Sequence, residues 1–182
     1  MEGAQEVFRR PGDESLALQT GAIVKRVLLL ISIASACGCG PSVDLTKGVQ
    51  VEALSTGWLD AGVVDGKNKV VPGLSFKLKN VSDQPLKTLQ VNAVFRRVSQ
   101  DEEWGSGFRT VAGSAGLAPG AATGTVTIRA DLGYTGSDSR EAMLSHSQFV
   151  DAKVDLFAKY GSTQWARIGE FPISRRLVAD AR

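Results

Sequence analysis

The sequence predicts an all-β protein, a single antiparallel β-sandwich of about seven strands with one short helix. Three observations predict this class. Apolar and polar residues alternate with period two in several segments of the chain. Clusters of turn-forming residues separate these segments roughly every 8–12 residues. No long helical segment stands between them, so parallel βαβ units are disfavoured.

The alternation is clearest in four segments. In each, apolar residues fall on one face and polar or charged residues on the other, as in an antiparallel sheet with one face in water. These segments are 74–79, 89–96, 125–130 and 150–159. Further strand candidates are 49–58, 104–112 and 163–173.

Turn residues fall where hairpins require them. Segment 80–85 holds an Asn, a Ser, an Asp and a Pro between two predicted strands. Residues 99–103 predict a polar hairpin tip, and residues 160–162 close the last hairpin. Pro119 and Gly120 form a turn signal before the next strand.

The long irregular stretch is 133–147. Within it, Asp138-Ser139-Arg140-Glu141 has the spacing of an acidic capping box and predicts a short helix after it. We expect this helix to cross between the sheets and cover an open end of the core. The alternative is a binding loop, since long loops often carry function. The candidate binding residues in this loop are Tyr134, Asp138 and His146.

The run from Lys25 to Cys39 has the layout of an export signal. Lys25 and Arg26 precede an apolar stretch, 27–36, which ends in small residues and a cysteine. A helix of about ten residues spans only about 15 Å of a bilayer core about 30 Å thick. A transmembrane helix is therefore disfavoured, and a buried core helix is the alternative.

The segment Ile33-Ala34-Ser35-Ala36-Cys37 resembles the lipobox of bacterial lipoproteins. The resemblance implies a diacylglyceryl group on the Cys37 thiol, removal of the leader, and acylation of the new N-terminus with a fatty acid such as palmitate. Ala34 stands where that family usually has a larger aliphatic residue. Cys39 is the second choice for lipidation. Ordinary cleavage, an uncleaved anchor and a cytoplasmic protein are the alternatives to lipidation.

The leader sets the expected domain organisation. The first residues are mixed in charge and fit no part of a signal, so they are either a disordered extension or a mis-assigned start, with synthesis beginning at Val24. The expected parts are an extension over 1–23, a signal peptide over 24–36, a lipidated tether over 37–48, a sandwich over 49–177 and a disordered tail over 178–182.

Segment 74–97 is similar to the first hairpin of small bacterial envelope sandwiches of the FxLYD type. The resemblance implies an immunoglobulin-like fold and nothing about ligands. The aromatic signature of that family is absent, because Phe95 is followed by two arginines. The residues that match its turns are Asn80, Ser82, Asp83, Pro85, Leu86, Pro119 and Gly120.

Composition excludes several function classes. The chain holds 21 basic and 19 acidic residues, so it lacks the strong basic excess that phosphate binding needs, and we expect no nucleic-acid partner. Both cysteines lie at the leader boundary. The body therefore has no disulfide framework, thiolate nucleophile or cysteine metal cluster.

No residue stands out as catalytic. His146 is the one histidine and lacks a nucleophile motif nearby, so we expect a loop histidine bonded to backbone. Residues 101–103 are acidic and are interpreted as a solvated hairpin tip, and residues between Asp60 and Asp65 as a loop without metal-binding spacing. The tryptophans are assigned to the core or sheet surface. We predict no metal and no cofactor.

The expected function follows from the cellular location that the leader predicts, because no catalytic or ligand-binding motif is present. We expect a lipoprotein of the cell envelope, anchored in the outer rather than the inner membrane. Its sandwich, facing the periplasm or the exterior, would bind another envelope protein or a cell-wall component without catalysis. The rival class is a small periplasmic hydrolase or carbohydrate-active enzyme with a site near 133–147. A structural spacer is the third possibility.

Overall fold

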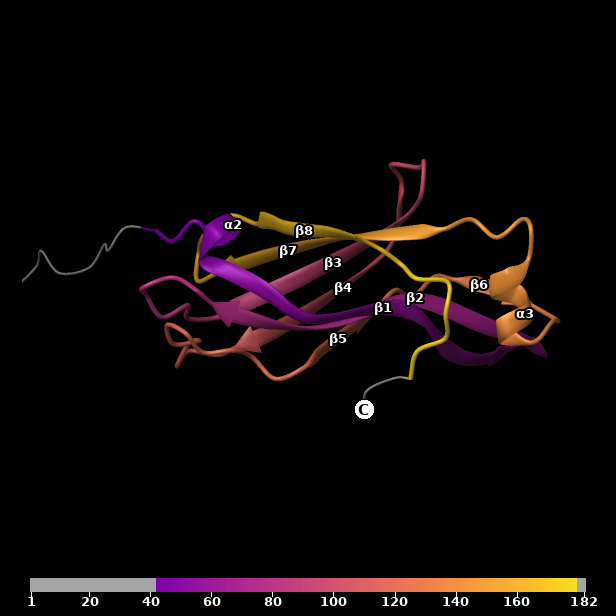
Figure 1. Cartoon of the computed structure of the whole chain (residues 1–182), viewed down its shortest axis with the longest axis horizontal. Coiled ribbons are helices and arrows are strands. Elements are labelled where there is room, and N and C mark those ends of the chain that lie inside the picture. The colour runs from indigo at the N-terminus through magenta and orange to yellow at the C-terminus, as the bar shows by residue number, and fades with distance from the viewer. Residues whose placement is uncertain (1–41, 180–182) are drawn as a thin grey trace, which may run out of the picture. The chain divides into compact units, whose positions relative to one another are not determined.

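The computed structural model describes residues 42–179. These residues form two antiparallel sheets that pack face to face, so the predicted β-sandwich is confirmed (Figure 1). The predicted signal, Cys37 and Cys39 lie outside the described residues.

The first sheet is built on one long hairpin. Strands β1 (Val49–Val64) and β2 (Lys67–Asn80) pair along almost their whole length. Strands β5 (Val126–Arg129) and β6 (Tyr134–Gly136) pair with β2 on its other side, one after the other along its length. Strand β2 is thus the centre of this sheet, and β1 is one edge.

The second sheet has the order β4-β3-β7-β8. Its strands are β3 (Leu89–Arg97), β4 (Glu103–Ala112), β7 (Ala152–Tyr160) and β8 (Ala166–Pro172). Strands β3 and β7 form its centre with an unbroken register of paired residues. The inward faces of the two sheets together make the core.

The predicted loop between Asp60 and Asp65 is wrong. β1 continues through it, and the reversal comes at Asp65 and Gly66, which have φ of 51° and 74°. Positive φ at both central residues is typical of the tight hairpin turn that matches strand twist. A register shift between Asp60 and Val63 interrupts the alternation here, which is why the pattern did not predict a strand.

The compact unit begins earlier than residue 49. Helix α2 (Leu45–Gly48) precedes β1, and Asp44 caps it by accepting a hydrogen bond from the Thr46 amide at 3.0 Å. Leu45 is buried in the core. Residues 43–48, expected in the tether, thus pack onto the sandwich, because Leu45 adds apolar surface to it.

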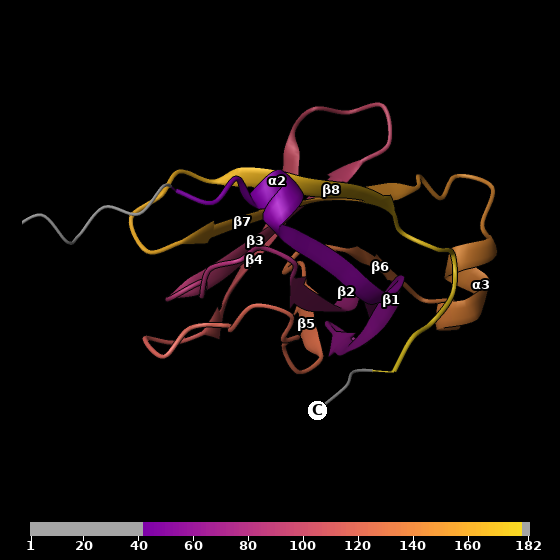
Figure 2. The same ribbon diagram turned by 60° about the vertical axis from the view of Figure 1, so that its left-hand side comes forward.

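Helix α3 (Arg140–Ser145) lies at the end of the sandwich far from α2 (Figures 1 and 2). The short helix was predicted, but its N-cap is Ser139, one residue later than the capping-box pattern implied. The Ser139 hydroxyl accepts a hydrogen bond from the Ala142 amide at 3.2 Å. The helix buries Met143 and Leu144 against the core, which covers that end.

The C-terminal segment closes one side. After β8 the chain crosses to β1, where the Trp58 amide donates to the Arg176 carbonyl at 2.8 Å and the Val178 amide donates to the Trp58 carbonyl at 2.9 Å. A side chain at Gly57 would overlap Val178. Residues 178–179, expected in a disordered tail, are therefore held along the β1 edge.

We expect Gly133→Ala to destabilise the fold by about 2–3 kcal/mol, because overpacking against backbone forces the chain to shift. A Cβ at Gly133 would overlap the Val70 carbonyl oxygen, where β6 begins to pair with β2. Gly113→Ala is the matched control, since a Cβ there meets nothing within 4 Å, and it should change stability by less than about 0.5 kcal/mol. Urea unfolding measures both. Equal losses of stability in the two variants would contradict the close approach of Gly133 to the Val70 carbonyl.

Candidate functional site

The three candidate loop residues come together. Tyr134, Asp138 and His146 line one cavity of about 330 Å³ at the α3 end of the sandwich. The other residues that line it are Thr135, Gly136, Met143, Gln148 and Phe149. The cavity is at the lower end of the size range of small-molecule sites. It would hold a small molecule or one or two side chains of a partner.

Hydrogen bonds to the sheet, the helix and a neighbouring loop fix the position of each of the three residues. Tyr134 pairs with Val70 in the sheet, and its hydroxyl donates to the Val150 carbonyl at 3.1 Å. The carbonyl of Asp138 accepts a hydrogen bond from the side-chain amide of Asn68 at 2.8 Å. His146 is the C-cap of α3, and its amide donates to the Met143 carbonyl. Sheet and helix thus fix the walls of the cavity.

The lining of the cavity is partly apolar and partly polar. Nδ1 of His146 accepts a hydrogen bond from the Gln148 amide at 3.2 Å, as expected for a loop histidine bonded to backbone. In a catalytic triad a carboxylate holds that nitrogen. Met143 and the rings of Tyr134 and Phe149 supply an apolar wall, and Asp138 and His146 supply exposed polar groups.

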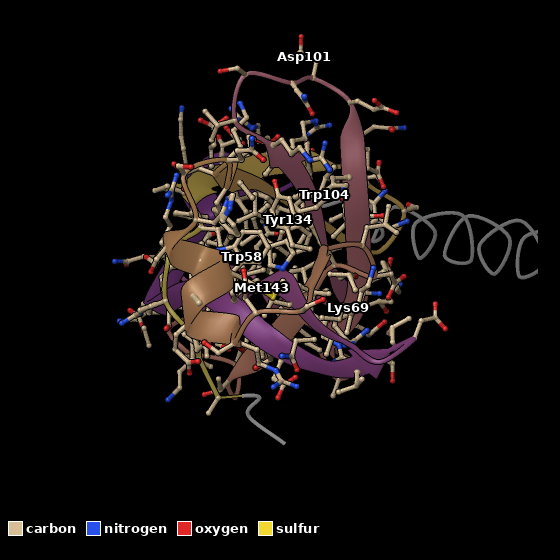
Figure 3. The ribbon with its side chains drawn as sticks, turned by 90° about the vertical axis from the view of Figure 1, so that its right-hand side faces the viewer. Trp58, Lys69, Asp101, Trp104, Tyr134 and Met143 are labelled. Carbon is tan, nitrogen blue, oxygen red and sulfur yellow. The ribbon has the colours of Figure 1, made fainter. Side chains whose placement is uncertain are left out.

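Residues 42–179 hold no group of three His, Cys, Asp or Glu side chains placed to bind a metal. The acidic hairpin tip with Asp101 extends away from the cavity, at the top of Figure 3. Asp101, Glu102 and Glu103 are all exposed.

An aromatic cluster lies directly behind the cavity. Trp58 contacts the rings of Trp104, Tyr134 and Phe149, with centroids 6.0, 5.6 and 4.8 Å away. Figure 3 shows Trp104, Tyr134 and Trp58 together at the centre of this end. Trp58 is fully buried, as expected for a core tryptophan, whereas Tyr134 and Trp104 are half-buried. Two rings of this cluster, Tyr134 and Phe149, therefore also serve as cavity wall.

Sequence reasoning missed some of these residues. Phe149 was an available signal, because it is a lone large aromatic residue within a polar loop. Arg97 was another, since it continues the inward-facing set of Val91, Ala93 and Phe95 with a cation. Arg175 lies with its guanidinium carbon 5.2 Å from the Phe149 ring centre and pairs with Asp151 at 2.5 Å. The hydrogen bond to Asp151 raises the pKa of Arg175.

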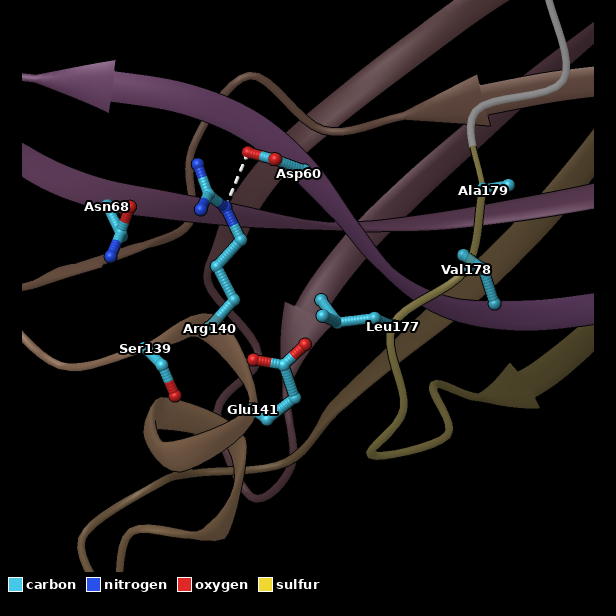
Figure 4. A pocket seen from close by; sticks show the side chains of 8 residues that line it. All are labelled: Asp60, Asn68, Ser139, Arg140, Glu141, Leu177, Val178 and Ala179. Atoms are coloured by element: carbon cyan, nitrogen blue, oxygen red, sulfur yellow. Dashed lines mark ion pairs between the residues drawn. The ribbon is translucent and has the colours of Figure 1, made fainter.

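A second cavity, of about 470 Å³, lies beside the start of α3 (Figure 4). Strands β1 and β2, the start of α3 and the C-terminal segment line it. Its principal cation and anion neutralise each other, since Arg140 Nε lies 2.7 Å from Asp60 Oδ1. This pair ties α3 to the first sheet. It thereby helps to position Met143 in the wall of the first cavity.

Asp60 also accepts a hydrogen bond from the Gly62 amide at 2.8 Å. That hydrogen bond, followed by the hydrogen bond and charge of Arg140, lowers the pKa of the Asp60 carboxyl. A carboxyl with a lower pKa in the folded state stabilises the fold above its unfolded pKa. That stability is lost as the pH falls through the folded value.

No family model matches the sequence. No curated protein matches it either. Among solved structures, one similar chain is described as "X-ray structure of Northeast Structural Genomics Consortium target SoR45". It is 15% identical, with 71% of this chain and 89% of that chain covered and a TM-score of 0.42. A likeness of this degree carries no argument about function. No helix within residues 42–179 is long and apolar enough to cross a membrane.

We expect Asp60→Asn to be less stable than the wild type at about pH 7 by less than about 1 kcal/mol, because the pair is exposed to solvent. The difference should disappear as the pH falls from about 5 to about 2, below the ordinary aspartate pKa of about 3.9. Thermal unfolding across this range measures it. In an Arg140→Gln background the difference should shrink but persist, because the Gly62 hydrogen bond is retained. A difference that does not depend on pH would contradict the lowered pKa.

Proposed function

We propose that the protein is a lipid-anchored lipoprotein of the cell envelope whose sandwich is a non-catalytic binding module. The observation that carries the binding role is the cavity at the α3 end. Tyr134, Asp138 and His146 all line this cavity, and the rings of Tyr134 and Phe149 pack against each other in its wall. The lipobox-like segment ending at Cys37 supports the anchor.

The position of the cavity suits an anchored module. Helix α2, where the chain enters the sandwich, and α3 lie at opposite ends (Figure 1). Val43 is six positions after Cys37, and such a segment reaches at most about 20 Å. In this proposal lipid on Cys37 keeps the α2 end near the membrane. The cavity then faces away from the membrane, toward another envelope protein or a cell-wall component.

Binding is favoured over catalysis by the surroundings of His146. A hydrolase of the rival class would need the histidine aligned with a nucleophile and a carboxylate, or two carboxylates across a cleft. Instead, the imidazole accepts from the amide of Gln148 two residues away. Gly38, after the lipidated cysteine, favours the outer membrane by analogy with enteric lipoproteins.

We expect mass spectrometry of the N-terminal peptide from membranes to find a diacylglyceryl group on Cys37. Cys37→Ser should abolish the lipid and release the protein from the membrane fraction, because each buried methylene contributes about 0.8 kcal/mol to the anchor. Cys39→Ser is the matched control and should remain lipidated. A free Cys37 thiol behind an intact leader would contradict the anchor.

The binding role has its own test. A photo-crosslinking amino acid at Gln148, exposed at the cavity, should give a discrete covalent adduct in intact cells. The same amino acid at Asp83, exposed in the turn between β2 and β3 at the α2 end, should give none there. Equal crosslinking from both positions, or none from Gln148, would contradict a binding surface at the cavity.

A further inference from the structure

Arg97 is placed where a strand would normally carry an apolar residue. It ends β3 on the inward-facing set of Val91, Ala93 and Phe95. Its guanidinium carbon lies 4.7 Å from the ring centre of Trp104 and 5.7 Å from that of Tyr134. The cation is therefore held among the rings that back the cavity.

In the described part of the chain, no carboxylate pairs with this cation. Arg97 Nε is buried and has no hydrogen-bond partner among residues 42–179, and no ion pair there includes Arg97. Three other arginines differ in this respect, since Arg96, Arg140 and Arg175 form ion pairs with Asp155, Asp60 and Asp151. A buried donor without an acceptor is costly and calls for an explanation.

A second donor in the same cluster is also unpaired. Trp58 is fully buried, and its Nε1–H has no partner in the described part of the chain. Ring faces can stabilise the charge of Arg97, but they do not accept the hydrogen bonds of Arg97 Nε–H and Trp58 Nε1–H as an oxygen atom would. Neither side chain lines the cavity itself, but both contact the ring of Tyr134, which does.

We propose that the α3 end of the sandwich binds an oxyanion group, carboxylate or phosphate, through Arg97. This deepens the proposed binding role and rests on it. Guanidinium groups recognise both anions through paired N–H bonds. Trp104 lies against the guanidinium of Arg97, so an anion bound there changes the surroundings of that ring. Binding should therefore change tryptophan emission.

The acidic residues nearest to Arg97 in the sequence lie in the hairpin that follows it. The carboxylates of Asp101, Glu102 and Glu103 follow it in the same hairpin and are exposed. None of them forms an ion pair with it within the described structure. Arg97 is the one cation that this proposal assigns to the anion, and a single ion pair near solvent is weak, so inorganic phosphate or acetate alone should bind in about the millimolar range.

The test uses the full chain in detergent, with sodium phosphate or sodium acetate replacing sodium chloride at constant ionic strength. Wild type should show a saturable change in tryptophan emission, and the salt that saturates at lower concentration identifies the preferred anion. Arg97→Met should weaken the response at least tenfold. Arg167→Met, which removes a cation already paired with Asp155 and Glu170 in the second sheet, is the control and should change it less than twofold. No saturation in wild type, or equal responses in wild type and Arg97→Met, overturns the proposal.

Thermal unfolding distinguishes a binding role from a structural one. Arg97→Met should unfold at the wild-type temperature or above it, because it removes an unneutralised cation and keeps the apolar contact with the rings. A large fall in its unfolding temperature would show that Arg97 is structural, and would overturn the proposal. Failure here leaves crosslinking from Gln148 unaffected, so the two proposals fail separately.

Discussion

Burial of Trp58 is the constraint on which the other parts of this sandwich depend. Its ring has no exposed surface and contacts Trp104 of the second sheet, Tyr134 of β6 and Phe149 of the loop before β7. Its backbone amide and carbonyl both pair with the C-terminal segment. One residue thus joins the two sheets, the cavity wall and the end of the chain. Truncation of a buried aromatic residue of this kind costs about 3–5 kcal/mol.

The inward position of Trp58 depends on a bulge. A register shift between Glu52 and Ser55 adds one residue to β1 relative to β2, and Ala53 there has φ of 50°. Before the bulge Val49 and Val51 face the core, and after it the even-numbered Thr56 and Trp58 do. Because side chains alternate with period two, one extra residue exchanges the two faces. Without it Trp58 would face solvent, and the aromatic cluster would not form.

At the α3 end of the sandwich, strand β4 of the second sheet also approaches β5 of the first sheet closely. Side chains at Gly105 and Gly107 would press on Ala130 and Ile128, so the two glycines let the edges of the two sheets approach each other. Trp104, next to Gly105, then lies against Trp58 and Arg97. The cluster therefore takes rings from both sheets and from the loop. In the proposed function this gives the binding loop a rigid aromatic base.

The sequence by itself determined the fold class, most strands, the turn at 80–85 and a short helix after Asp138, because these features depend on local alternation and turn chemistry. For 133–147 it predicted a short helix covering the end of the core, with a binding loop as the alternative. Only the tertiary structure decided the continuous β1–β2 hairpin, the bulge that turns Trp58 inward and the meeting of Tyr134, Asp138 and His146 with Phe149. It also decided that Arg97 has no counter-charge among residues 42–179. These features depend on register and on contacts between residues far apart in the chain, and a period-two pattern carries no information about either.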